Sequence, residues 1–130
     1  MTAIADDTTA FKCCTVCGCT WDSLRDFVTD STLRVDGYQA CFANPQAGLV
    51  MVTHCEDHCG TTLGLMVGAL RPLYDGPEHQ ESYYGREPCR ELCLRHNILE
   101  ECDVDCEMAW ARTALQWLRR HALPPHLSER

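Results

Sequence analysis

The pattern of apolar and polar residues predicts a short helix and then a β-hairpin in the first half of the chain. Apolar residues recur at helical spacing over residues 21–28, and Thr20 or Asp22 is available as an N-cap. Residues 35–43 and 49–54 are rich in strand-forming side chains, and an Asn-Pro-Gln-Ala-Gly turn sequence separates them. Two strands joined by such a turn are expected to pair as a hairpin.

A second helix is expected after Gly60, and it should be buried. Thr61 and Thr62 are available as caps, and Pro72 should end the helix near residue 70 or 71. The apolar residues that cover nearly every face of such a helix are Leu63, Leu65, Met66, Val67 and Leu70. A helix without a polar face belongs in the core of a protein.

The C-terminal half is predicted to be helical. Residues 75–88 contain several Gly and Pro residues among polar ones and should form a connecting loop. A short helix is expected over residues 89–97, and an amphipathic helix should begin at Asp103 or Asp105 and end near His121. The whole pattern predicts an α+β fold in one compact domain.

Cysteine accounts for 11 of the 130 residues, which packing alone seldom requires, so disulfides, metal or thiol redox chemistry must explain the number. Residues 1–11 are expected to be a poorly ordered tail, and they lack the basic start and apolar run of a secretory signal. The longest apolar stretch, residues 60–70, is too short to span a membrane. We therefore expect a cytoplasmic protein whose reduced thiols favour metal thiolates over disulfides.

The charge balance bears on the choice of partner. The formal net charge is −8, which opposes binding to nucleic acid. The basic residues Arg112, Arg119 and Arg120 are interpreted as solvated positive charge in the last turns of a helix. The expected partner is a protein.

The first group of cysteines has the spacing of a metal site. Cys14-Thr-Val-Cys17-Gly18 has the form of a zinc knuckle, in which two cysteines close on one ion and the glycine permits the tight turn. A second cysteine pair follows the predicted hairpin, directly before the predicted buried helix. The expected ligands of this site are Cys14, Cys17, Cys55 and Cys59, with His54 or His58 as a substitute for Cys55.

A knuckle, a hairpin and a ligand pair in the first turn of a helix resemble the treble-clef zinc-finger arrangement, and the resemblance covers residues 13–71. It implies a structural zinc ion. The chain departs from that arrangement because the ligands of the second pair are normally two residues apart, and because the helix near Leu24 is additional. A catalytic alternative is an activated Cys59 nucleophile beside the histidines, but metal ligation explains more of the cysteines at once.

The second group consists of two pairs with four-residue spacing, Cys89 with Cys93 and Cys102 with Cys106. On two antiparallel helices joined near residues 97–100, each pair would occupy one helix face and the four sulfurs would meet. Three outcomes are open: a four-cysteine zinc site, an iron or iron-sulfur centre, and two disulfides between the helices. Zinc is favoured under reducing conditions.

These observations divide the chain into a tail (1–11), a treble-clef-like metal-binding half (12–74), a loop (75–88) and a helical half with a four-cysteine site (89–130). The predicted function is that of a non-enzymatic, cysteine-rich protein with two structural zinc sites that serves as a protein-interaction or regulatory module. The alternative is an iron-sulfur or thiol-based protein of electron transfer or redox sensing. Such a role would begin at the cysteines outside both sites, which are Cys13, Cys19 and Cys41.

Overall fold

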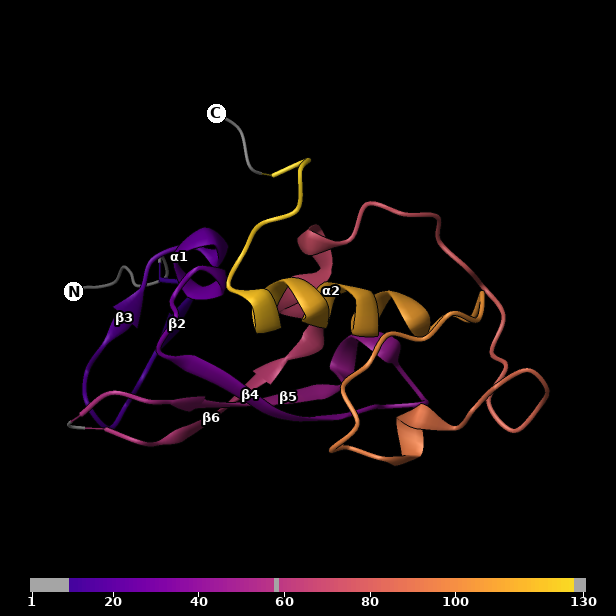
Figure 1. Cartoon of the computed structure of the whole chain (residues 1–130), viewed down its shortest axis with the longest axis horizontal. Helices are drawn as coiled ribbons and strands as arrows, with labels where there is room; N and C mark the ends of the chain where they lie inside the picture. Colours follow the sequence, from indigo (N-terminus) through magenta and orange to yellow (C-terminus); the bar gives the residue numbers. More distant parts are fainter. Residues whose placement is uncertain (1–9, 58, 128–130) are drawn as a thin grey trace, which may run out of the picture.

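A three-stranded antiparallel β-sheet lies at the centre of the molecule in the computed structural model, which describes residues 10–57 and 59–127 (Figure 1). Its strands are β4 (Leu33–Gln39), β5 (Leu49–His54) and β6 (Thr62–Met66), and β5 is the central strand. The sequence predicts the hairpin formed by β4 and β5. Its connection contains the 3-10 turn η2 (Pro45–Ala47), which Asn44 caps by accepting a hydrogen bond from the Gln46 backbone N–H.

The prediction of a buried helix after Gly60 is wrong, because residues 62–66 form strand β6 and Val67–Leu73 form the 3-10 helix η3. In β6, Leu63 and Leu65 are buried, whereas Thr62 and Met66 are exposed. This alternation has the period of two that a strand requires, and the backbone of β5 offers the pairing edge. The element that would be the helix of a treble clef is therefore a strand in this chain.

The N-terminal segment forms a small hairpin followed by one short helix. Strands β2 (Lys12–Cys13) and β3 (Thr20–Trp21) pair with each other, and α1 (Leu24–Val28) follows them. The helix lies where the sequence predicts it. Its N-cap is Ser23, whose hydroxyl accepts a hydrogen bond from the Asp26 backbone N–H, rather than Thr20 or Asp22.

The predicted C-terminal helical hairpin is only half present. Helix α2 (Ala109–Arg120) forms, but it begins several residues later than expected. Residues 74–108 contain one element of regular structure, the 3-10 turn η4 (Leu92–Leu94), so neither cysteine pair lies on an α-helix. Backbone carbonyls of this segment are paired with side chains of α2, because Arg112 and Gln116 donate to Leu92, Ile98, Leu99 and Glu100. Long-range hydrogen bonds thus replace the helical ones.

One hydrophobic core joins the sheet to the elements around it. Helix α2 and η3 pack together over one face of the sheet, and the β2–β3 hairpin with α1 lies at one end of it (Figure 1). Arg112, interpreted from the sequence as a solvated charge, has no exposed surface. Among the residues that the structure describes, no helix is both long enough and apolar enough to cross a membrane.

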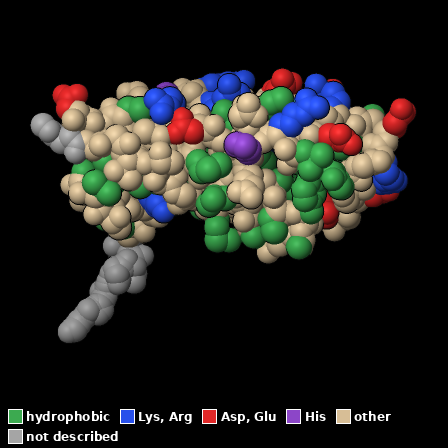
Figure 2. All heavy atoms as spheres, turned by 90° about the horizontal axis from the view of Figure 1, so that it is seen from below, with side chains coloured by type: hydrophobic (Ala, Val, Ile, Leu, Met, Phe, Trp, Pro, Cys, Tyr) green, Lys and Arg blue, Asp and Glu red, His purple; other side chains and the backbone are tan. Residues whose placement is uncertain are grey.

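The opposite face of the molecule shows where hydrophobic side chains remain exposed. In the view from below, they gather in the half that Figure 1 draws on the right, where the long C-terminal loops lie (Figure 2). Phe42, Tyr84 and Leu94 are among the large apolar residues that are at least 40% exposed. The half with fewer regular elements therefore carries a group of exposed apolar side chains.

Candidate metal centre

Four side chains from separate parts of the sequence converge at the end of the sheet near the β2–β3 hairpin. One ligand atom from each of Cys14, Cys17, His54 and Cys59 lies within 4.8 Å of all the others. The Cys14 and Cys59 sulfurs are 3.6 Å apart, and the Cys17 sulfur is 3.5 Å from His54 Nδ1. Ligands on one tetrahedral zinc ion would be about 3.8 Å apart for two sulfurs and about 3.6 Å for sulfur and nitrogen. The cluster has the size that one tetrahedral ion requires.

The first two cysteines are positioned by a tight turn between β2 and β3. Gly18 follows Cys17 with a φ of 83°, and its N–H donates to the Cys14 carbonyl at 2.8 Å. The Cys14 N–H donates to the Cys19 carbonyl at 2.8 Å, which closes the base of the turn. Glycine adopts this positive φ without the penalty that a Cβ atom brings. The tight turn that the sequence predicts after Cys17 is therefore present.

Cys59 is placed by the turn between β5 and β6. Gly60 has a φ of 83° and donates its N–H to the His54 carbonyl at 2.9 Å, so the chain turns back directly after Cys59. The Thr61 N–H donates to the Cys59 sulfur at 3.5 Å. The sequence places Cys59 at a helix N-terminus, whereas in the structure the hydroxyl and the N–H of Thr61 in the turn supply the stabilising dipoles instead.

The histidine of the cluster is set by the alternation of β5. Val50, Val52 and His54 share the buried side of the strand, and His54 is only 2% exposed. Cys55 is the next residue and is exposed, with its thiol directed to the Thr53 carbonyl at 3.7 Å. The structure thus brings His54 into the cluster and leaves Cys55 outside it, while His58 lies outside the described residues.

The protonation of the three thiols is uneven. Backbone hydrogen bonds from Cys17 and Val16, opposed by burial, lower the pKa of Cys14 to about 7. A backbone hydrogen bond from Cys19 favours the Cys17 thiolate, but burial and the neighbouring Cys14 and Cys59 raise its pKa to about 11. Hydrogen bonds from Thr61 lower the pKa of Cys59. Three adjacent thiolates repel one another, so full ionisation of the cluster requires a cation.

The side chains of Trp21 and Asp30 lie next to the cluster, where Trp21 packs against the His54 ring. The Trp21 ring stands edge-on to the His54 imidazole with the centroids 5.1 Å apart, and Trp21 Nε1 donates to Asp30 at 2.8 Å. Burial opposes ionisation of Asp30, but hydrogen bonds from Thr32 and Trp21 outweigh it and lower the pKa of this carboxyl. The sequence carries no signal for the role of Asp30, because no characteristic spacing links a carboxylate to the indole N–H that it accepts.

The other cysteines have varied environments, and all 11 are free thiols. Cys13 is exposed, and burial raises the pKa of Cys19. The second predicted set, Cys89, Cys93, Cys102 and Cys106, lines a single cavity. Among the residues that the structure describes, no three of these sulfurs lie within 4.8 Å of one another. Burial raises the pKa of Cys93, and the nearby guanidinium of Arg112 opposes this effect.

The fold and the cluster define a cysteine-rich protein of mixed helix and sheet with a candidate Cys3His metal centre. Comparison of the chain with models of protein families, with curated proteins and with solved structures found no match.

Proposed function

We propose that Cys14, Cys17, His54 and Cys59 bind one zinc ion and that this ion has a structural role. The observation that carries the proposal is the pair of ligand distances, 3.6 Å between the Cys14 and Cys59 sulfurs and 3.5 Å between the Cys17 sulfur and His54 Nδ1. Three thiolates and one imidazole form one of the donor sets of structural zinc sites.

The chemistry of the cluster supports a structural ion rather than a catalytic one. Four protein ligands complete a tetrahedron and leave no position for water or substrate, whereas catalytic zinc keeps one position open. Cys14 has no exposed surface and His54 is 2% exposed, so half of the ligand set lies in the protein interior. The ion would join the β2–β3 knuckle to the β5–β6 turn.

We propose further that the protein acts through contacts with other proteins, as an interaction or regulatory module. Its net charge of −8 opposes binding to nucleic acid. A filled Cys3His site offers no Lewis acid position to a substrate. The charge supports a protein partner over nucleic acid, and the closed ligand set supports a binding role over an enzymatic one.

Metal analysis of the purified protein tests the zinc proposal. We expect colourless protein with zinc bound at the Cys14 cluster, and replacement by Co²⁺ should give the visible absorption of a tetrahedral thiolate site. In Cys17→Ser the Co²⁺ absorption should fall by the contribution of this cluster, while Cys13→Ser is the matched control with an exposed neighbouring thiol. Coloured protein that holds iron would favour the electron-transfer alternative, and protein that holds neither metal and has its cysteines paired in disulfides would refute both.

A further inference from the structure

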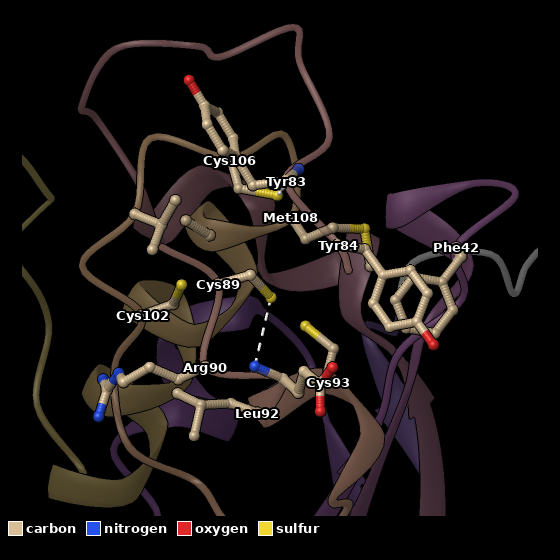
Figure 3. A pocket seen from close by; sticks show the side chains of 13 residues that line it. Phe42, Tyr83, Tyr84, Cys89, Arg90, Leu92, Cys93, Cys102, Cys106 and Met108 are labelled. Atoms are coloured by element: carbon tan, nitrogen blue, oxygen red, sulfur yellow. Dashed lines mark hydrogen bonds between the residues drawn. The ribbon is translucent and has the colours of Figure 1, made fainter. Parts of the chain in front are cut away.

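The second cysteine group lies at the other end of the molecule from the Cys14 cluster, in the long loops on the right of Figure 1. Cys89 and Cys93 come from the segment around η4, and Cys102 and Cys106 come from the segment before α2. All four line one cavity of about 20 Å³, and their side chains approach the same space from different directions (Figure 3). That volume is about the space of one water molecule or one small ion.

Backbone N–H groups donate to two of these sulfurs. The Glu91 N–H donates to Cys89 at 3.2 Å, and the Tyr83 N–H donates to Cys106 at 3.4 Å. The contact from the second residue after Cys89 repeats the contact that Thr61 makes with Cys59 in the first cluster. Such N–H groups stabilise thiolate more than thiol, because the partial positive charge of the donor faces the sulfur.

A buried positive charge lies beside the cavity. Arg112 has no exposed surface, and its guanidinium donates to the carbonyls of Leu92, Ile98 and Glu100 and lies near the Cys93 thiol. Within residues 10–57 and 59–127, no carboxylate forms an ion pair with Arg112, and its Nε has no hydrogen-bond partner. A buried cation is costly unless an anion compensates it.

We infer that Cys89, Cys93, Cys102 and Cys106 bind a second divalent ion of the zinc class, independently of the Cys14 cluster. On binding, the four thiols form four metal–sulfur bonds and release four protons to solvent. Four thiolates with one Zn²⁺ carry a net charge of about −2, which places an anion beside the buried guanidinium of Arg112.

Binding must also move the loops. No three of the four sulfurs, all in the described part of the chain, lie as close together as the ligand atoms of the first cluster, whereas ligands on tetrahedral zinc would be about 3.8 Å apart. Between η3 and α2 the only regular element is the three-residue turn η4, so this segment lacks the hydrogen-bonded ladders that would resist such a shift. The ion thus closes the cavity and fixes loops that the small buried cluster of Val104, Cys106, Met108 and Ala109 supports only weakly.

The first test needs no substitution. The full chain, purified under reducing conditions, is expected to hold two zinc ions, one from each site. Alkylation with N-ethylmaleimide followed by mass spectrometry should quickly modify Cys13 and Cys55, which are exposed. Cys89, Cys93, Cys102 and Cys106 should stay protected until a strong chelator is added. A single zinc with these four cysteines modified as fast as Cys55 would overturn the inference, as would disulfides among them in the protein as purified.

Variants distinguish the two sites. Cys102→Ser should lower the zinc content by one ion and expose the other three cysteines to alkylation, whereas Cys41→Ser should leave both values unchanged. Cys41 is the matched control because it lies beside the cavity residue Phe42 without lining the cavity itself. If only the Cys14 cluster fails to bind metal, Cys14, Cys17 and Cys59 become reactive while the second set stays protected. If Cys102→Ser does not fold, the alkylation of the unmodified chain decides the question.

Discussion

Cys55 and Cys59 stand four residues apart, and the fold gives them different surroundings. Cys59 belongs to the cluster, whereas Cys55 is exposed and points to the Thr53 carbonyl. We predict that Cys59→Ser lowers the zinc content by about one ion per chain and lowers the melting temperature, because a hydroxyl is a poor zinc ligand. Metal analysis and calorimetry measure the two effects.

The matched control for that substitution is Cys55→Ser, which should keep both the zinc content and the melting temperature. Loss of one ion in Cys55→Ser, with normal zinc in Cys59→Ser, would mean that Cys55 binds the ion instead of Cys59 and that the assignment of Cys59 is wrong. Each substitution replaces one sulfur with oxygen in the same turn. Effects of the Cys→Ser change that do not involve metal should therefore be similar in the two variants.

The uneven pKa values of the thiols make a second prediction at this scale. With a pKa of about 11, Cys17 is protonated at pH 8, while Cys14, with a pKa of about 7, is mostly thiolate. Zinc must displace the Cys17 proton, so binding at pH 8 should release at least about one proton per ion at this cluster, and affinity should rise with pH. Calorimetry in buffers of different ionisation enthalpy, carried out with Cys102→Ser, measures the release. An affinity that is independent of pH would contradict the prediction.

Three of the four residues of the candidate metal cluster follow from the sequence, and the fourth shows where such reasoning ends. Cys14, Cys17 and Cys59 are recognisable because closely spaced cysteines followed by glycine are typical of metal-binding turns. The choice between His54 and Cys55 depends on which of two successive residues of a strand points inward. Val50 and Val52 pack against the core, and this decides which residues of the strand point inward. The spacing of the cysteines alone does not reveal it.

At the scale of elements, β6 is the clearest departure from the predicted pattern. A helix buried on all faces would bury both Leu65 and Met66, whereas the strand leaves Leu65 6% exposed and Met66 56% exposed. Leu65→Ala should therefore lower the free energy of unfolding by about 2 to 4 kcal/mol. Met66→Ala should change it by less than about 0.5 kcal/mol. Urea unfolding followed by circular dichroism compares the two variants, and equal losses would contradict the strand.

The reason for the error is specific to this segment. Apolar residues at most of positions 63–70 satisfy a helical template as well as a strand template. The strand forms because β5 offers an unpaired edge. The sequence of residues 62–66 alone does not show that this pairing partner is available. The β4–β5 hairpin could be predicted because its turn sequence and its strand formers are adjacent in the chain.

The segment before α2 departs from prediction for a related reason. Its cysteine spacing and apolar residues favour helices in isolation, yet several of its carbonyls accept hydrogen bonds from Arg112 and Gln116. The sequence favours a surface position for Arg112, because arginine is rarely buried. Arg112 is buried because the loop before α2 wraps around its side chain. Such a long-range contact cannot be read from the local sequence.

For the whole molecule, the two cysteine groups lie at opposite ends of the sheet and α2, and the main hydrophobic core extends from Cys14 along the sheet and α2 (Figure 1). The core contains residues of the sheet, η3 and α2 that do not depend on either metal site. Metal at each end would therefore act on the loops of that end first. Separate local effects are expected rather than one common switch.

This arrangement predicts where the loss of the first ion acts. The β2–β3 hairpin is tied to the core by Phe11, Trp21 and Phe27, but its knuckle reaches the β5–β6 turn through the cluster. In Cys59→Ser, hydrogen exchange followed by mass spectrometry should become faster in residues 12–20 and 54–61, while α2 and β4 stay protected. Cys55→Ser should exchange at the rates of the unmodified chain.

The size of the effect follows from linkage. Free zinc at a thousandfold excess over its dissociation constant adds about 4 kcal/mol to the stability of the folded state. For a chain of 130 residues, losing that contribution should lower the melting temperature by about 10 °C or more. Equal loss of protection throughout the molecule would mean that the core needs the ion in order to fold. Unchanged exchange at the knuckle would mean that hydrophobic contacts alone hold the hairpin, and the structural role proposed for zinc would then be wrong.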